Sequence, residues 1–269
     1  MVGHPAGPAR TGKLAAASAE QGDHEGAHAL AMLQRDAAMP DRIAIRSNRD
    51  LAPYIDHTLL KPGVTREELV KLCDEARTYG FATVCVASHN VALCARLLEG
   101  SHTRPISVVG FPSGTETTEA KVAEARDAIS AGAAEIDMVI HVGRLKAKDY
   151  VYVERDIRAV VEATTPRPVK VILETGALSR DEKAIGAALA KAAGAAFVKT
   201  STGFGPGGAT VEDVALLRNV VGPEMGVKAS GGIRTAADAR RMIGAGATRI
   251  GASASVAIVT GEAAHGVRY

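Results

Sequence analysis

The chain has 269 residues, of which 46% are hydrophobic and 23% charged, and its formal net charge is +2. The length is sufficient for one large core. Lys and Arg form no basic stripe and only 3% of residues are aromatic, so we expect no nucleic-acid partner. We also expect no membrane partner, because no apolar run approaches the roughly 18 residues that a spanning helix needs.

The N-terminal segment, residues 1–45, is rich in Ala, Gly and His and shows no alternation of strands and helices. It lacks the continuous apolar stretch of a secretion signal, and its acidic residues argue against a transit peptide. We therefore expect a mobile extension with a short helix near residues 27–37, followed by one folded domain over 46–269.

From residue 51 onward, short apolar runs alternate with longer amphipathic stretches. Two helix starts illustrate the signal: Thr65 followed by Glu68 forms a full capping pattern, and Thr118 followed by Lys121 a weaker one. The apolar runs predict strands over 53–58, 81–86, 105–110, 134–141, 168–174, 195–201, 226–230 and 248–253.

Eight strands that alternate with helices predict a single-domain α/β fold, a parallel (β/α)8 TIM barrel. Glycines that precede four of the strands are placed as helix-ending glycines should be: Gly80, Gly132, Gly194 and Gly246. A doubly wound open sheet is the alternative. It normally has fewer strands, and no dinucleotide fingerprint follows the first strand here.

The alternation of side chains along each strand predicts which ones face the barrel interior. Because the apolar face should pack on the helices, the opposite face points inward. On this basis the interior receives Asp137, Lys170, Lys199 and Lys228. Lys170 lies early in its strand, where an internal ion-pair network explains it equally well. Lys199 and Lys228 are expected near the carboxyl ends of their strands, where barrel active sites lie.

Two neighbouring interior lysines predict amine chemistry. A lysine is a nucleophile only when unprotonated, and its reference pKa is about 10.4. Burial and a second ammonium both lower that pKa. Lys199, which follows an apolar run and is expected beside Lys228, therefore suits Schiff-base formation with a carbonyl. Asp137, two strands away, could transfer the protons that imine chemistry requires.

The loops after the last three predicted strands are rich in glycine: "STGFGPGG", "SGGIR" and "GAS". In barrels, the loops after the last strands often hold a phosphate through backbone N–H groups. We expect such a site; glycines that simply form tight strand-to-helix turns are the weaker alternative for any single loop. The residues we assign to it are Gly203, Gly231, Gly232, Gly251 and Ser253.

Over residues 54–253 the sequence resembles the deoxyribose-phosphate aldolase family. The most specific segments are "FVKTSTGFGPGGAT" and "VKASGGIRT", and "YIDHTLLKP", "GAAEIDMVI" and "KVILETG" add to the match. The resemblance implies a class I aldolase that needs neither metal nor organic cofactor. It implies reversible cleavage of 2-deoxy-D-ribose 5-phosphate to acetaldehyde and D-glyceraldehyde 3-phosphate, in cytoplasmic nucleoside catabolism, by a homo-oligomer that is commonly a dimer.

Carried over by motif, the resemblance makes Lys199 the Schiff-base lysine, Lys228 the lysine that tunes it, and Asp137 the proton donor and acceptor. Further residues in matching positions are expected to contact the substrate: Asp56, Thr58, Cys85 and Thr202. With only three cysteines and no CxxC spacing, we expect reduced thiols and no zinc site.

The sequence departs from the family pattern at two places. Many relatives have Asn-Pro where this chain has Ala87-Ser88, and many have Asn where this chain has His141. These changes leave open a Schiff-base aldolase that acts on a different phosphorylated sugar. A catalytically silent sugar-phosphate-binding barrel would be expected to lose a lysine or Asp137, and all three are present.

The last residue, Tyr269, is a further candidate. Some members of the family end in a tyrosine that folds over the barrel mouth and assists proton transfer. A phenol can both donate and accept a proton. A frayed terminus is the alternative, since final residues are commonly disordered.

Overall fold

The computed structural model describes residues 1–3 and 45–262. Most of the predicted extension over residues 1–45, including the short helix expected near 27–37, lies outside the described residues, and so does Tyr269. The domain boundary at residue 46 therefore stays a prediction. Across the described part of the chain, no helix combines the length and apolar character needed to cross a membrane.

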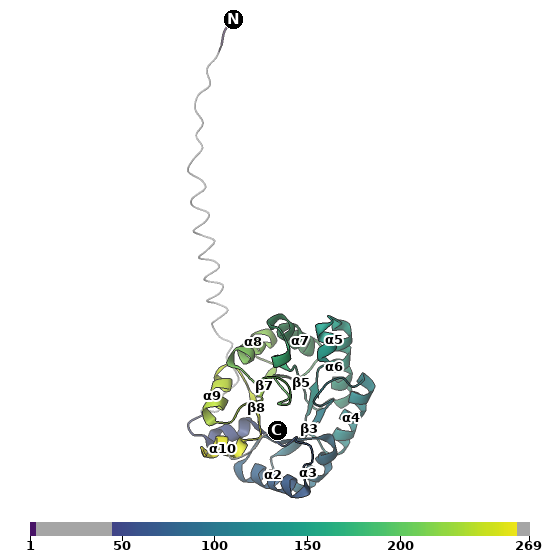
Figure 1. The fold of residues 1–269 in the computed structure, drawn as a ribbon, viewed down its shortest axis with the longest axis vertical. Coiled ribbons are helices and arrows are strands. Elements are labelled where there is room, and N and C mark those ends of the chain that lie inside the picture. Colours follow the sequence, from purple (N-terminus) through teal and green to yellow (C-terminus); the bar gives the residue numbers. More distant parts are fainter. Residues whose placement is uncertain (4–44, 263–269) are drawn as a thin grey trace. The chain divides into compact units, whose positions relative to one another are not determined.

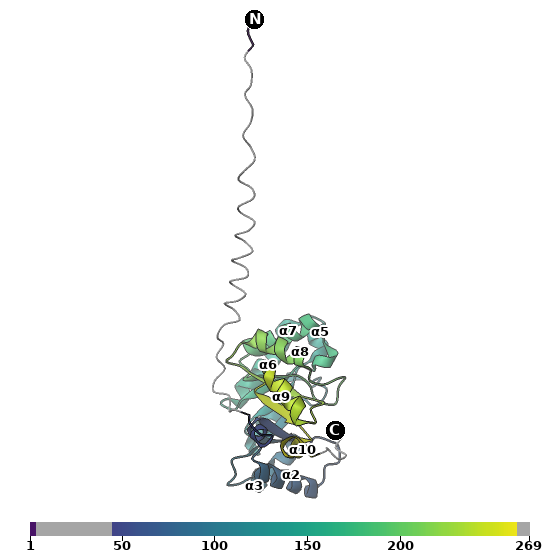
Figure 2. The same ribbon diagram turned by 90° about the vertical axis from the view of Figure 1, so that its left-hand side faces the viewer.

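The predicted barrel is confirmed: eight parallel strands form one closed sheet in chain order, with β1 paired to β8. Figure 1 shows the strands at the centre of a ring of helices, and Figure 2 shows the helices from the side. The strands are β1 (Ile55–Thr58), β2 (Thr83–Val86), β3 (Arg104–Val109), β4 (Ile136–Val139), β5 (Val169–Ile172), β6 (Phe197–Lys199), β7 (Gly226–Ser230) and β8 (Arg249–Ala252).

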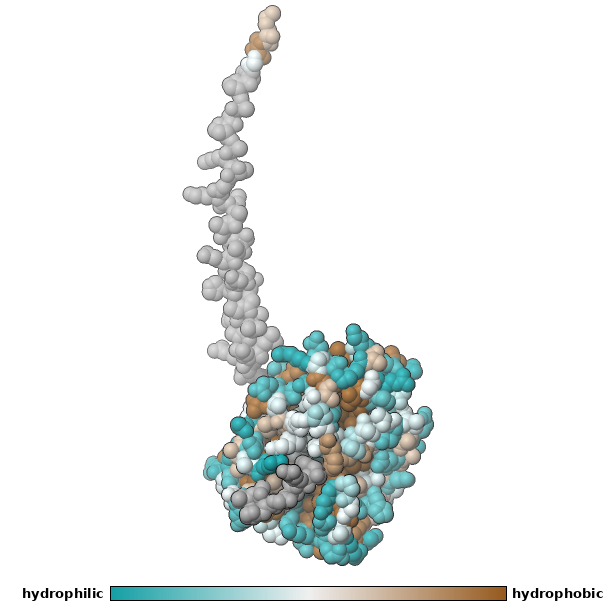
Figure 3. Space-filling model, in the orientation of Figure 1, coloured by the Kyte–Doolittle hydropathy of each residue, from teal (hydrophilic) through white to brown (hydrophobic). Residues whose placement is uncertain are grey.

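Helices and short 3-10 turns connect the strands along the barrel. The α-helices are α2 (Arg66–Tyr79), α3 (Val91–Leu97), α4 (Thr118–Ser130), α5 (Val142–Lys146), α6 (Tyr150–Thr164), α7 (Arg180–Ala192), α8 (Val211–Val221), α9 (Ala236–Gly244) and α10 (Ser255–Thr260). The 3-10 turns are η1 (Arg49–Tyr54), η2 (Ser88–Asn90) and η3 (Thr175–Ala177). Hydrophilic residues line most of the outer edge of the face shown in Figure 3, and hydrophobic ones gather toward its middle.

One predicted helix start is right and the other is displaced by one residue. Thr65 and Glu68 form a reciprocal capping box at α2. At α4 the cap is Thr117, whose hydroxyl accepts from the backbone N–H of Ala120, and not Thr118. The Thr118 hydroxyl instead donates to Asp156 on α6. The residue that the sequence pattern assigns to the cap therefore makes a contact between two helices.

The core lies between the strands and the helices, as the alternation predicts. Apolar strand residues such as Ile136, Met138 and Val171 are fully buried in one large cluster with the helices. Inside the barrel, the apolar cluster is small and contains Cys85, Ile106 and Val108. Much of the remaining interior is filled by charged side chains, which position the candidate site.

Candidate active site

Asp137 is the centre of a buried ion-pair network inside the barrel. Its Oδ2 accepts from Lys199 Nζ at 2.9 Å and from Lys228 Nζ at 2.7 Å, and its Oδ1 accepts from Lys170 Nζ at 2.8 Å. All four side chains are at most 3% exposed. The structure therefore brings together the two lysines and the aspartate that the sequence singles out, and adds Lys170 to them.

Strand register explains this convergence. Lys199, the last residue of β6, is the direct partner of Lys228 on β7, and Asp137 on β4 is the partner of Lys170 on β5. Lys228 is the third of five residues in β7, so it lies in mid-strand and not at the carboxyl end as we expected. Lys170 lies early in β5, where an ion-pair role was the predicted alternative, and it is ion-paired to both Asp137 and Glu135.

The two neighbouring lysines have opposite pKa shifts. Burial lowers the pKa of Lys199, the nearby Lys228 ammonium lowers it further, and Asp137 opposes the change. Burial also acts to lower the pKa of Lys228, but Asp137 and Asp56 outweigh it and raise that pKa above its ordinary value. Lys228 is thus held as a permanent cation beside an amine that loses its proton more readily.

Asp137 and Asp56 remain carboxylates in spite of their burial. Burial acts to raise the pKa of Asp137, but Lys170, Lys199 and Lys228 hold it well below its usual range. Burial acts in the same way on Asp56, whose pKa Lys228 and Arg249 hold below its usual range. The site therefore contains anions that could accept a proton only from a group made strongly acidic by the reaction.

Replacing Lys228 with leucine tests whether its charge tunes Lys199. Without this cation the pKa of Lys199 should rise, so the acidic limb of the kcat/KM profile should move to higher pH by about one unit. A purely structural lysine would instead reduce thermal stability and leave the profile in place.

Lys121 provides the matched control for this variant. It is equally buried, on α4, and its Nζ donates to Asp156 at 2.7 Å outside the barrel. Lys121→Leu should therefore reduce stability without moving the pH profile. Equal shifts in the two variants would rule out tuning by Lys228.

The floor of the barrel contains two charged residues that the sequence analysis did not select. Arg249 donates to Asp56 Oδ1 at 2.7 Å and to Glu135 at 3.3 and 3.4 Å, and Glu135 is ion-paired to Lys170. Glu135 and Arg249 are only 15% and 16% exposed. The sequence did contain a signal for both residues. Glu135 lies two positions before Asp137 and so shares its inward-facing side of the strand, and Arg249 begins a strand.

Asp56 and Thr58, predicted to contact the substrate, are engaged within the protein. Asp56 accepts from Thr83 and Arg249, and its other oxygen is ion-paired to Lys228. The Thr58 hydroxyl donates to the Asp56 carbonyl at 2.9 Å. This geometry gives Asp56 the role of holding Lys228, and substrate contact by these residues stays a prediction.

Cys85 lies on β2, and Thr202 lies in the loop after β6. Cys85 is fully buried and burial raises the pKa of its thiol, so it stays protonated. The Thr202 hydroxyl is hydrogen-bonded to Glu174 and accepts from the backbone N–H groups of Phe204 and Gly205. Thr202 thus shapes the loop after β6, together with Glu174, a residue in the left-handed conformation that the sequence did not reveal.

The predicted phosphate residues fall into two kinds. Gly203, Gly231 and Gly232 have φ of 89°, 90° and 78°, a region that favours glycine. A Cβ on Gly231 would come within 3.0 Å of Gly208, whereas a Cβ on Gly232 would meet nothing within 4 Å. Packing therefore does not require a glycine at position 232, and the backbone there is open to approach by another molecule.

Gly251 has a different explanation. It lies within β8, where a Cβ would come within 2.9 Å of Ser230 Cβ and 3.0 Å of Lys228 Cε. The small residue makes room for the lysine, whether or not a phosphate binds nearby. Ser253 is half-buried and follows β8 directly. Phosphate contact by Gly251 and Ser253 stays a prediction.

The two departures from the family pattern are engaged with neighbouring helices. The Ser88 hydroxyl donates to Glu124 on α4 at 2.9 Å. His141 caps α5 by accepting from the backbone N–H of Arg144, and its ring packs edge-on against Tyr152. Because β4 ends at Val139, the alternation that would place His141 inside the barrel does not extend to it.

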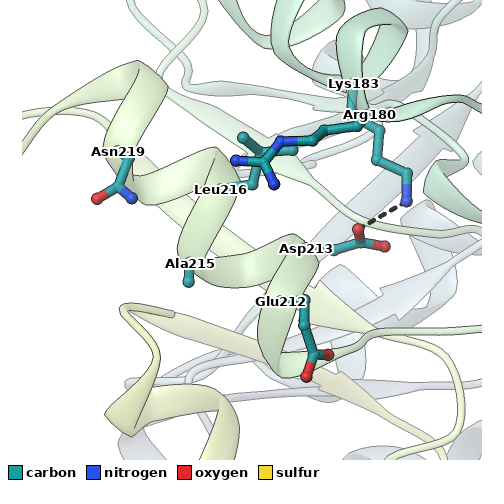
Figure 4. A pocket seen from close by; sticks show the side chains of 7 residues that line it. All are labelled: Arg180, Lys183, Glu212, Asp213, Ala215, Leu216 and Asn219. Carbon is teal, nitrogen blue, oxygen red and sulfur yellow. Dashed lines mark hydrogen bonds and ion pairs between the residues drawn. The ribbon is translucent and has the colours of Figure 1, made fainter.

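A cavity of about 330 Å³ lies outside the barrel, between α7 and α8. Figure 4 shows Lys183 of α7 reaching Asp213 of α8, and their ion pair is 2.7 Å long. The charged residues that line it are Arg180, Lys183, Glu212 and Asp213. The two cations that line this cavity are thus balanced by two carboxylates, and the lysines of the barrel interior do not line it.

Comparison with known proteins places these observations in a family. Residues 50–266 match the model of the DeoC/LacD family of aldolases. The chain is 56% identical to the deoxyribose-phosphate aldolase of Clostridium perfringens strain SM101, over 80% of this chain and 96% of that one. It is 57% identical to that of Streptococcus sanguinis, over 80% and 98%. A deoxyribose phosphate aldolase structure from Aeropyrum pernix, described as tetrameric, superposes with a TM-score of 0.75 at 36% identity and covers 80% of this chain and 91% of its own.

Proposed function

Because the chain belongs to the DeoC/LacD family of aldolases, we propose that it reversibly cleaves 2-deoxy-D-ribose 5-phosphate through a Schiff base on Lys199. The products are acetaldehyde and D-glyceraldehyde 3-phosphate. The observation that supports this proposal best is the pair of lysines on one carboxylate. Lys199 is a buried amine with a lowered pKa, and Lys228, held as a cation, shares Asp137 with it.

The reaction begins with the open-chain sugar aldehyde. The lone pair of Lys199 Nζ attacks C1 to form a carbinolamine, and loss of water gives an iminium ion. The positive nitrogen is an electron sink, so it can accept the electrons of a neighbouring carbon–carbon bond. Burial, which lowers the pKa of Lys199 from its ordinary value, contributes by favouring the unprotonated amine that the first step requires.

Cleavage then breaks the bond between C2 and C3. Its electron pair forms the C1–C2 double bond of an enamine, while the C3 hydroxyl loses its proton to Asp137 or to a water molecule. C3 becomes the aldehyde carbon of D-glyceraldehyde 3-phosphate, which leaves. Protonation of the enamine at C2 and hydrolysis of the resulting imine release acetaldehyde and restore the amine.

Reductive trapping tests the assignment of the lysine. Acetaldehyde and borohydride should leave a reduced two-carbon group on Lys199, which peptide mass spectrometry locates. An adduct on Lys170 or Lys228 instead would overturn the assignment, because these lysines contact the same aspartate. Acetaldehyde release, compared across several sugar phosphates, tests the substrate and separates deoxyribose phosphate from another phosphorylated aldose or ketose.

Gly232 is proposed to let the phosphate approach the backbone. Gly232→Ala places a methyl group into the open space beside the loop after β7. We expect kcat/KM for deoxyribose 5-phosphate to fall at least about tenfold more than kcat/KM for unphosphorylated deoxyribose. Equal losses on the two substrates would mean that the loop serves the fold and not the phosphate.

Gly80 supplies the control for backbone strain. It has φ of 72°, ends α2, and also has nothing within 4 Å of its would-be Cβ. Gly80→Ala therefore introduces a similar strain, which left-handed geometry sets at about 1–2 kcal/mol. It should change the two substrates' kcat/KM values by the same factor.

We further propose that the enzyme works in the cytoplasm as a homo-oligomer, a dimer or a larger assembly. The tetrameric relative supports self-association. Cys73, Cys85 and Cys94 are free and buried, which fits a reducing compartment. The family resemblance also supports Tyr269 as a mobile auxiliary in proton transfer, although this residue lies outside the described part of the chain.

A further inference from the structure

The charges of the ion-pair network around Lys199 balance only when Lys199 is neutral. Among the described residues, the ion-pair network joins three carboxylates to four cationic side chains: Asp56, Asp137 and Glu135, with Lys170, Lys199, Lys228 and Arg249. If Lys199 is protonated, the network has one uncompensated positive charge. If Lys199 is neutral, three cations face three anions.

Side chains from five strands contribute to the surroundings of Lys199. Asp137 on β4 and Lys228 on β7 act directly, and the Cys85 thiol of β2 also faces the amine. Lys170 on β5 and Asp56 on β1 act through Asp137 and Lys228. The nearby Glu174 carboxylate is instead hydrogen-bonded to the backbone N–H and the hydroxyl of Thr202 in the loop after β6.

Two members of the network lie toward the opposite end of the barrel strands from the reacting amine. Glu135 directly precedes β4 and Arg249 begins β8, so they occupy the floor of the barrel, opposite the mouth where substrate enters. They contact one another, and each is linked to Lys199 through other members: Glu135 through Lys170 and Asp137, and Arg249 through Asp56 and Lys228. Lys199 itself is ion-paired to Asp137 and to neither of these two residues.

We propose that Glu135 and Arg249 are positioning residues that set the protonation state of Lys199 from the floor of the barrel. Glu135 supplies the third negative charge and Arg249 the third positive charge of the balanced network. Removing one of them should therefore act on Lys199 with the opposite sign from removing the other. The inference rests on the proposed role of Lys199 as the Schiff-base lysine.

The direction of each effect follows from charge. Glu135→Gln leaves an excess positive charge, so the Lys199 ammonium is disfavoured and the acidic limb of kcat/KM should move to lower pH. Arg249→Gln leaves an excess negative charge, so that limb should move to higher pH. Unit charges about 10 Å apart at an effective dielectric constant near 20 shift a pKa by about one unit, and partial exposure reduces this to about half a unit to one unit.

The decisive measurement is the pH dependence of kcat/KM in the two single variants and the double variant. The double variant restores equal numbers of charges, so its profile should return to within about 0.3 unit of the parent, by cancellation of the two shifts. The substrate is the same throughout, so ionisation of its phosphate cancels in the comparison. A structural role would reduce stability in all three proteins and would not produce opposite shifts.

Two controls separate charge from shape and from surface effects. Arg249→Lys keeps the positive charge and should keep the parent profile. Arg104→Gln removes an exposed cation from the same end of the barrel, since Arg104 begins β3, and should also leave the profile in place. Glu135→Gln is nearly isosteric, so it provides the test even if an Arg249 variant does not fold.

Opposite shifts that cancel in the double variant would support the proposal. Absent shifts, or shifts of the same sign, in folded and active proteins would overturn it. Failure of the proposed function has a different signature: the parent protein would then give no reduced adduct at Lys199 and release no acetaldehyde.

Discussion

Replacing Lys199 with arginine is expected to reduce aldol cleavage by at least about four orders of magnitude, because a guanidinium stays protonated and cannot form an imine. The positive charge beside Asp137 is kept, so the network retains much of its electrostatic support. The measurement is acetaldehyde release from deoxyribose 5-phosphate, with thermal unfolding to show that the variant is folded.

Lys170→Arg is the matched control for this prediction. Lys170 donates to the same aspartate at 2.8 Å and is fully buried, but it is assigned no bond to the substrate. The control should therefore still form the reduced adduct at Lys199. Retention of more than about one hundredth of the parent rate in Lys199→Arg would exclude Lys199 as the essential amine.

Asp137→Asn should separate imine formation from turnover. The substitution removes the negative charge that three lysines share. Loss of one member of a buried ion pair commonly costs about 3–5 kcal/mol of stability. Loss of the proton donor and acceptor should reduce turnover by a further factor of about 10²–10⁴. The pKa of Lys199 should fall, since Asp137 acts to raise it, so trapping with borohydride should persist.

Asp156→Asn controls for the loss of stability alone. Asp156 on α6 is the buried partner of Lys121 at 2.7 Å, outside the barrel. This variant should be destabilised to a similar degree and should keep its turnover at temperatures where it is folded. If Asp137→Asn turns over within about tenfold of the parent under the same conditions, Asp137 is not the proton carrier.

Much of the interior could be predicted from sequence because it follows from local periodicity. Strand alternation places Asp137, Lys199 and Lys228 on the inward face without knowledge of the strand order. The prediction fails where the strand ends: β4 stops at Val139, and His141 becomes a helix cap.

The partners of each charge could not be predicted in this way. Whether Asp56 meets Lys228, Arg249 or both depends on how adjacent strands are offset around a closed barrel. The alternation of side chains along a strand predicts which face of the sheet a residue lies on, but it does not predict the offset between adjacent strands. The same limit applies to Gly251, which looks like a loop glycine in sequence and is explained by the Lys228 side chain that crosses it.

The pairing of β8 with β1 also determines when the site comes into existence during folding. Arg249 and Asp56 are 193 positions apart, and Lys228 and Asp137 are 91 apart. A chain that has formed β1 to β7 still lacks Arg249 and leaves the edge of β1 open, so water can reach the lysines that the finished barrel desolvates. Pairing of β8 with β1 thus completes the surroundings of the reactive amine, because the lowered pKa of Lys199 depends on burial. During refolding, recovery of imine formation should therefore report closure of the ring itself, later than the appearance of helices.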